Sequence, residues 1–153
     1  MSMKDLQDAF ELIDQNADQA YFSGPKSEEL VKQAEEALEI TFPPSYREFL
    51  RRLGCGDIAG QEFYGIVNGN VENVSVPNGI WLTLTERKST SLSRSPIIIG
   101  DTGDGGYYAI DRSVTTDGES PVVEWWAGPN AQIAVAQDFG EFFLRMISDA
   151  LEE

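Results

Sequence analysis

Two aspartates in a glycine-rich segment are the side chains whose type and spacing first suggest chemistry. Asp101 and Asp104 lie within residues 101–106, between the apolar run 97–99 and an aromatic and aliphatic run at 107–111. Carboxylates in a loop are typical calcium ligands, and an EF-hand loop binds calcium through oxygens at positions one, three, five and twelve, with a glycine at position six. The first question is therefore whether this segment holds a cation.

The spacing excludes that form of calcium loop. Counted from Asp101, positions three and five are Gly103 and Gly105, and position twelve is Arg112. A phosphate-binding loop is excluded as well, because the pattern G-x-x-x-x-G-K-[ST] is absent and two aspartates would repel a phosphate. Glycine tolerates positive φ angles and aspartate accepts hydrogen bonds from nearby N–H groups, so a tight structural turn is favoured over an ion site.

The absence of histidine restricts the enzyme classes that remain. Without it the chain has no Ser-His-Asp triad, no Cys-His pair and no histidine metal ligand. Carboxylate pairs for acid–base catalysis remain available, but 26 acidic residues supply many such pairs and none stands out. We expect no catalytic residue, no metal site and no cofactor, and a carboxylate-dependent hydrolase or a metal-binding protein is the least favoured alternative.

The charge of the chain indicates a basic partner. The 153 residues carry 26 acidic and 11 basic side chains, a formal net charge of −15. From residue 95 onward there are 11 acids and 2 bases, so the excess is greatest in the C-terminal part. Direct binding of nucleic acid is not expected, because phosphate contacts need a basic surface, whereas a basic protein would be attracted. The alternative is that the acidic surface serves solubility.

Four segments show the apolar periodicity of amphipathic helices. They begin near Ser2, Ser27, Pro44 and Asp138, which are residue types that favour helix N-termini. Their apolar faces are Leu6, Ala9, Phe10 and Ile13; Leu30, Val31, Ala34 and Leu38; Tyr46, Phe49, Leu50 and Leu53; and Phe139, Phe142, Phe143, Met146, Ile147 and Ala150. The basic cluster Arg47, Arg51 and Arg52 lies on the third helix, where we expect it to complement the helix C-terminus or to pair with acids.

Most of the remaining segments predict strands. Residues 97–99 form a β-branched run typical of a strand covered on both faces, and with 107–111 they predict a hairpin around the six-residue turn 101–106. Residues 61–67 predict another strand, with a turn signal at 68–69 and a weaker strand at 71–76. Residues 80–87 fit either a helix or a strand, and residues 16–25 are typical of a loop.

A third strand of the predicted sheet begins at Pro121 and carries two adjacent tryptophans. Alternation directs Trp125 to one face and Glu124 and Trp126 to the other, so we expect one ring to be buried and the other at least partly exposed. Tryptophan is enriched at binding hot spots. The candidate contacts with a partner protein are Asp101, Asp104, Glu124, Trp125 and Trp126.

The order of these elements predicts an α+β fold with N-terminal helices, a mainly antiparallel meander sheet and a C-terminal amphipathic helix packed on it. No linker or repeat divides residues 1–153, so we expect one domain. No apolar run approaches the roughly 20 residues of a membrane span, and no signal peptide precedes the first helix. The single cysteine, Cys55, allows no internal disulfide. We therefore expect a cytoplasmic protein with no membrane partner.

Three motifs occur in a fixed order along the chain. Residues 36–50 (EALEITFPPSYREFL) resemble E-x-x-L…L-P-x-x-Y-x-x-F-L, residues 98–111 (IIGDTGDGGYYAID) resemble I-G-D-x-G-G-x-x-Y-x-x-D, and residues 136–143 (AQDFGEFF) resemble A-x-S-F-x-E-F-L. Together they resemble the SUKH superfamily, of the Smi/Knr cell-wall-regulator type. The resemblance covers roughly residues 27–150.

This resemblance implies an α+β fold without catalysis. Bacterial members are immunity proteins that bind and neutralise a co-produced toxin, often a nuclease, and eukaryotic relatives are interaction modules in signalling. It therefore implies an antitoxin whose partner is a cognate toxin, a basic nuclease, with a non-enzymatic signalling or scaffold module of the same fold as the alternative. The acidic side chains would occupy the basic cleft of the nuclease in place of its substrate. Contact residues do not transfer by motif, because binding surfaces vary widely in the family.

Overall fold

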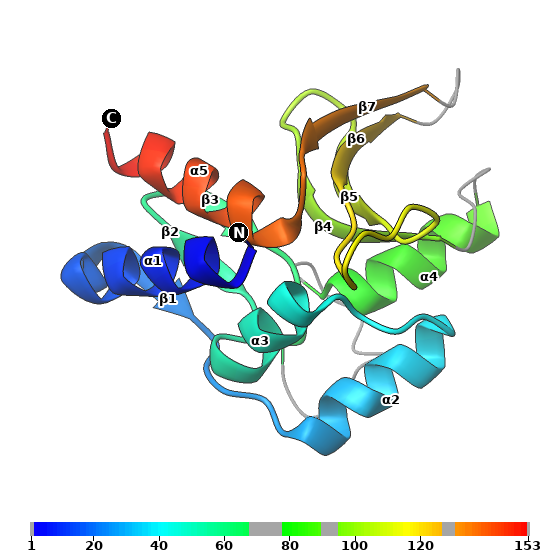
Figure 1. Ribbon diagram of the computed structural model, residues 1–153, viewed down its shortest axis with the longest axis horizontal. Coiled ribbons are helices and arrows are strands. Elements are labelled where there is room, and N and C mark those ends of the chain that lie inside the picture. The colour runs from blue at the N-terminus through cyan, green and yellow to red at the C-terminus, as the bar shows by residue number, and fades with distance from the viewer. Residues whose placement is uncertain (1, 68–77, 90–94, 127–130, 153) are drawn as a thin grey trace.

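The computed structural model describes residues 2–67, 78–89, 95–126 and 131–152 and shows an α+β fold (Figure 1). The helices are α1 (Ser2–Gln15), a 3-10 turn η1 (Ala17–Gln19), α2 (Glu28–Leu38), α3 (Pro44–Arg52), α4 (Gly79–Ser89) and α5 (Phe139–Leu151). The strands are β1 (Ala20–Phe22), β2 (Gly56–Ile58), β3 (Gln61–Phe63), β4 (Pro96–Asp101), β5 (Tyr107–Asp111), β6 (Val122–Trp126) and β7 (Ala131–Ala136). The predicted fold class is confirmed.

The strands form two antiparallel meanders rather than one sheet. The smaller has the order β1-β2-β3 and the larger the order β4-β5-β6-β7. Helix α4 packs on one face of the larger sheet, where Leu82 joins a cluster with Ile98 and Trp125. Helix α5 packs on the opposite face, where the ring of Phe142 lies 5.0 Å from that of Tyr108. The predicted packing of the last helix on the sheet is therefore confirmed.

Polar side chains fix the starts of the predicted helices. The Ser27 hydroxyl accepts a hydrogen bond from the N–H of Leu30 (3.1 Å), and the Asp138 carboxylate accepts one from the N–H of Glu141 (2.9 Å). Both bonds satisfy N–H groups that have no partner within the helix. Helix α3 begins at Pro44, as predicted, whereas α1 begins at Ser2 itself, so this serine is the first helical residue rather than its cap.

The ambiguous segment 80–87 is a helix. The side-chain oxygen of Asn78 accepts hydrogen bonds from the N–H groups of Ile80 and Trp81, each at 3.0 Å. Asn78 thus takes the N-cap position, and α4 begins at Gly79. This start lies one residue before the segment 80–87, in which the apolar residues fit both a helix and a strand. The helix presents Ile80 to the main core and Leu82 to the cluster on the larger sheet.

Strand β4 is buried on both faces, as predicted, and its outer edge is occupied. Ile97, Ile98 and Ile99 are fully buried. Ile99 is the extra residue of a β-bulge, and its carbonyl accepts a hydrogen bond from the N–H of Tyr64 (2.8 Å), which joins the smaller sheet to the larger. The N–H of Ile98 donates to the hydroxyl of Thr83 in α4 (2.9 Å). Neither backbone group is therefore left to pair with another strand.

Aromatic rings from α3 and α5 fill the main core. Phe49 has no exposed surface, and its ring lies 5.2 Å from that of Phe139 and 5.1 Å from that of Phe143. The Tyr46 ring stacks on Phe49, and its hydroxyl donates to the carbonyl of Tyr64 (2.9 Å). The four predicted apolar helix faces lie in or against this core, with the exception of Ala150.

Three strands were not predicted and one is shorter than predicted. Residues 16–25, expected to be a loop, contain η1 and β1, and the partner strand β2 follows Gly54 without a local signal. The strand expected at 61–67 ends at Phe63, and β7 was missed. Strands of three residues are too short to show a period of two. The turn predicted at 68–69 and the strand predicted at 71–76 lie outside the described residues.

Candidate functional site

The turn between β4 and β5 is held by its own polar groups. Asp101 is the last residue of β4, so the predicted six-residue turn has five residues, 102–106. The Asp101 carboxylate accepts a hydrogen bond from the N–H of Gly103 (2.5 Å). The Thr102 hydroxyl accepts one from the N–H of Gly106 (3.1 Å) and lies 2.6 Å from the carboxylate of Asp104. These bonds support the interpretation of a structural turn.

Neither aspartate belongs to a set of ligands suited to a metal ion. Within the described residues, no three His, Cys, Asp or Glu side chains converge. A lone carboxylate or a pair does not supply the six to eight oxygens that calcium prefers. The described part of the chain therefore offers no ligand set on which to place a cation.

The two tryptophans of β6 face opposite ways, as predicted. Trp125 is only 1% exposed and its ring stacks on Tyr107, with 6.3 Å between ring centroids. Trp126 is partly exposed, and its ring lies against Gly106 of the turn. A Cβ atom added to Gly106 would come within 2.8 Å of this ring. Of the two predicted contacts, Trp126 keeps part of its surface exposed, whereas Trp125 is a core residue.

The two aspartates of the turn also serve different faces of the larger sheet. Asp101 pairs with Tyr107 in the strand register, on the α4 side. Burial raises the pKa of the Tyr107 hydroxyl, and the charges of Glu86 and then Asp101 raise it further. Asp104 acts instead on Tyr108, on the opposite side. The charges of Asp104 and Glu124 thus both act on Tyr108, whereas that of Asp101 acts on Tyr107 and Tyr64.

A row of side chains crosses three strands on the side of Asp104. Tyr108 of β5 is paired with Glu124 of β6, which is paired with Ile133 of β7. Paired residues of neighbouring strands point to the same face, about 5 Å apart. Burial raises the pKa of the Tyr108 hydroxyl, the charges of Glu124 and Asp104 raise it further, and Arg145 acts in the opposite direction. Ile133 is 60% exposed.

We name this surface the acidic sheet face, and it comprises Asp104, Tyr108, Glu124, Trp126 and Ile133. Sequence reasoning found three of these residues and missed Tyr108 and Ile133. Their place depends on the register between strands, and β7 was not predicted. The alternation that directs Glu124 and Trp126 to one side was the only local signal.

Two acids of α2, Glu28 and Glu35, pair with arginines of α3, as expected of the basic cluster. The guanidinium of Arg47 bridges the carboxylates of Glu28 and Glu35, and Arg51 pairs with Glu28 at 2.5 Å. These pairs tie α3 to α2. Arg52 instead lies over the ring of Phe10, 4.1 Å from its centroid.

The acids around the larger sheet have no such neutralisation. Among residues that the structure describes, no lysine or arginine forms an ion pair with Asp101, Asp104 or Glu124. Arg145, whose charge acts on Tyr108, donates to the carbonyl of Val135 and lies 4.0 Å from the carboxylate of Glu141. The acidic sheet face therefore keeps its negative charge available to a partner.

A small polar cluster contains the single cysteine. Cys55 is 2% exposed and its thiol lies 3.6 Å from the hydroxyl of Ser23, to which the ammonium of Lys26 donates (2.9 Å). Burial raises the pKa of the thiol and lowers that of the ammonium. A raised pKa keeps the thiol protonated, the form that is neither nucleophile nor metal ligand. The cluster holds the exit of β1 against the start of β2.

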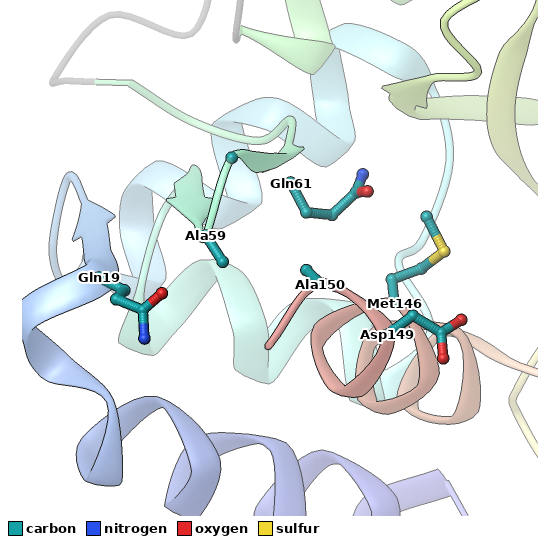
Figure 2. Close-up of a pocket in the computed structure, with 7 residues that line it drawn as sticks. Gln19, Ala59, Gln61, Met146, Asp149 and Ala150 are labelled. Atoms are coloured by element: carbon teal, nitrogen blue, oxygen red, sulfur yellow. The ribbon is translucent and has the colours of Figure 1, made fainter. Parts of the chain in front are cut away.

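A hollow of about 420 Å³ opens between η1, the β2–β3 turn and α5 (Figure 2). It is lined by Gln19, Ala59, Gly60, Gln61, Met146, Asp149 and Ala150. Asp149 is the only ionisable group in this lining.

A family model described as SUKH_6, SMI1-KNR4 cell-wall, matches residues 28–143. The match runs from the first turn of α2 to the aromatic residues of α5 and includes the β4–β5 turn. The chain belongs to the SMI1-KNR4 family. Members of this SUKH family are known as immunity proteins of toxin systems and are generally not enzymes. Helix α1 and the greater part of α5 lie outside the matched residues.

None of the helices described for this SMI1-KNR4 protein is both long enough and apolar enough to span a membrane. The longest, α1, has 14 residues and carries charged residues along its length.

Proposed function

We propose that this SMI1-KNR4 protein is an immunity protein that binds a cognate toxin, a basic nuclease, and neutralises it by stoichiometric occlusion. The observation that carries the proposal is the acidic sheet face, whose carboxylates find no basic partner among the described residues. A nuclease holds its polyanionic substrate in a basic cleft. Glu124 and Asp104 would interact with the basic side chains that line such a cleft, so that the substrate is excluded.

The apolar members of the same surface would supply the contact area. Trp126 is partly exposed and Ile133 is mostly exposed, and both border Glu124. Partly exposed aromatic residues are frequent anchors of protein interfaces, while charges at the rim guide the encounter. An apolar centre with an acidic border is therefore suited to a protein partner with a basic surface.

The test is recovery of the partner followed by a titration. The tagged chain is used to capture proteins from its native host, and the protein that co-purifies is isolated and assayed on DNA and RNA. Nuclease activity should fall linearly as the chain is added and should vanish at one equivalent. An activity that persists in excess of the chain would overturn the proposal, and a partner without nuclease activity would favour the signalling or scaffold module.

A further inference from the structure

Strand β7 presents an open edge of the larger sheet. Among the strands that the structure describes, it is the last in the order and pairs with β6 only. In Figure 1 no helix or strand lies beyond it. Gln132, Ile133 and Ala134 are exposed. The unpaired N–H and C=O groups of such an edge are a template for another strand.

At the opposite edge of the sheet, outward backbone groups of strand β4 already have hydrogen-bond partners. There the backbone groups of Ile98 and Ile99 bond to Thr83 and Tyr64. On β7 one carbonyl is taken in a similar way, because the bulge residue Val135 accepts a hydrogen bond from Arg145. The free length of the edge therefore ends at this bulge and includes residues 132–134.

The open edge adjoins the acidic sheet face. A strand added to β7 would lie about 4.8 Å from it, so that one of its side chains would extend the row beyond Ile133. The carboxylate of Glu124 would then be two strand spacings away, about 10 Å. A lysine or arginine that lays its apolar stem over Ile133 would direct its charge toward the carboxylate of Glu124, which extends from β6 on the same face.

Charge decides between the possible occupants of the edge. A second copy of this chain would bring two molecules of net charge −15 together, with Glu124 of each near the shared edge. A basic segment would instead place its cations where the described residues leave carboxylates without ion pairs. We propose that an extended basic segment of the partner protein, with arginine or lysine at alternate positions, adds to β7 as a fifth strand and directs its cations over Ile133 to Glu124.

This inference rests on the proposed function for its partner, but it is tested without one. The probe is a blocked hexapeptide of alternating arginine and valine, titrated into the intact chain by calorimetry and followed by the backbone amide signals of residues 132–134. The same peptide with alternate backbone nitrogens methylated keeps its charge and cannot pair. It should bind about tenfold more weakly, since it loses hydrogen bonds worth about 1 kcal/mol each. A glutamate and valine peptide should not bind.

Variants of the chain distinguish the contribution of the strand edge to peptide binding from the contribution of the carboxylate charge. Ile133→Lys puts a cation on an exposed side chain of the edge and should abolish binding of the arginine peptide. Glu124→Gln should weaken binding about threefold, in the range of a single exposed ion pair. Glu11→Gln on α1 is the matched control for loss of one charge and should leave the affinity unchanged.

Three results would overturn the inference. The first is equal affinity for the methylated and unmethylated peptides, and the second is an equal effect of Glu124→Gln and Glu11→Gln on peptide binding. The third is self-association of the chain, measured by sedimentation, that Ile133→Lys abolishes. This third result would assign the edge to a second copy. Experiments with the captured toxin distinguish a failure of this inference from a failure of the proposed function. If Ile133→Lys loses the peptide but still neutralises the toxin at one equivalent, the function stands and the docking site is wrong. If no toxin exists but the peptides bind in the expected pattern, the docking site stands.

Discussion

Glu119 is a single carboxylate that connects two distant parts of the chain. It accepts hydrogen bonds from the N–H and the hydroxyl of Ser45, at 2.9 and 2.8 Å, at the start of α3. Burial raises the pKa of this carboxyl and so does the charge of Asp138, while the bonds from Ser45 and the charge of Arg112 act against them. The desolvation of the charged form outweighs these opposing effects, so the pKa of Glu119 is raised.

Replacing Glu119 with glutamine should therefore change the pH dependence of stability. A carboxyl whose pKa is higher in the folded state than its ordinary value of 4.5 binds more protons when folded. Its contribution is present below the ordinary value and is lost as the pH rises through the raised folded value. Glutamine does not ionise, so Glu119→Gln should gain stability relative to the native chain as the pH rises through that window.

The measurement is urea unfolding of both proteins at a series of pH values on either side of the ordinary carboxyl pKa. Glu11→Gln, which removes an exposed acid from α1, controls for the change in net charge. A native chain that gains stability over Glu119→Gln with rising pH would show that the ionised carboxylate is favoured by its bonds to Ser45.

Helix α3 is the element on which the core depends most. It has nine residues and begins at Pro44, and its two faces have different partners. One face buries Tyr46 and Phe49 against α5, and the other places Arg47 against the carboxylates of α2. Since so short a helix is marginal in isolation, its stability comes from this packing.

Shortening Phe49 to alanine should cost ~3–5 kcal/mol of unfolding free energy, because a fully buried ring is replaced by a cavity. The control is Tyr21→Ala on β1, where the side chain is 70% exposed and the expected change is within about 0.5 kcal/mol. Chemical denaturation of the two variants provides the comparison. A loss below roughly 1 kcal/mol for Phe49→Ala would mean that this helix face does not pack as described.

The sequence predicts an element well when several local signals agree. Helix α2 combines an apolar period with a serine cap, and α5 combines one with the cap at Asp138, so both were predicted. Helix α4 was ambiguous because Ile80 and Leu82 fit both periods, and the cap that decides the matter, Asn78, lies just upstream. The composition of β7 has few aromatic or β-branched residues, so its pairing with β6 determines its structure.

The same limit applies to the candidate site. Alternation along β6 was sufficient to predict that Trp125 and Trp126 would differ in burial, because that property depends on one strand. The action of Asp101 and Asp104 on different tyrosines depends on the geometry of the turn, and the position of Ile133 beside Glu124 depends on the register between strands. No pattern within a few residues encodes either.

The whole molecule has an uneven distribution of charge. Two of its seven arginines, Arg47 and Arg51, pair with Glu28 and Glu35 between α3 and α2. The larger sheet keeps acids without ion pairs among the described residues. A basic partner should therefore be attracted toward the larger sheet before contact is made.

The rate of association with a basic partner should fall steeply with salt, because the screening length shrinks from ~10 Å at 0.1 M to ~3 Å at 1 M. Neutralising Asp101, Asp104 and Glu124 together should slow association and flatten this dependence, with a smaller effect on dissociation. The matched variant neutralises Asp5, Asp8 and Glu11 and should matter less. Stopped-flow mixing with the purified partner at several salt concentrations measures both. Equal effects of the two sets, or a rate independent of salt, would defeat the model of long-range attraction.

The bonds that Thr83 and Tyr64 make to β4 have a consequence for growth of the sheet. Stacking of β-strands from molecule to molecule propagates only when each molecule has one edge that receives a strand and another that is offered to the next. The larger sheet has its outer groups occupied at Ile98 and Ile99. A strand received at β7 would therefore not be passed on at these two positions of β4, and growth of fibres through this sheet is disfavoured. If a partner strand adds to β7 as proposed, each copy would bind a single partner, which would set the dose of the chain required to match it.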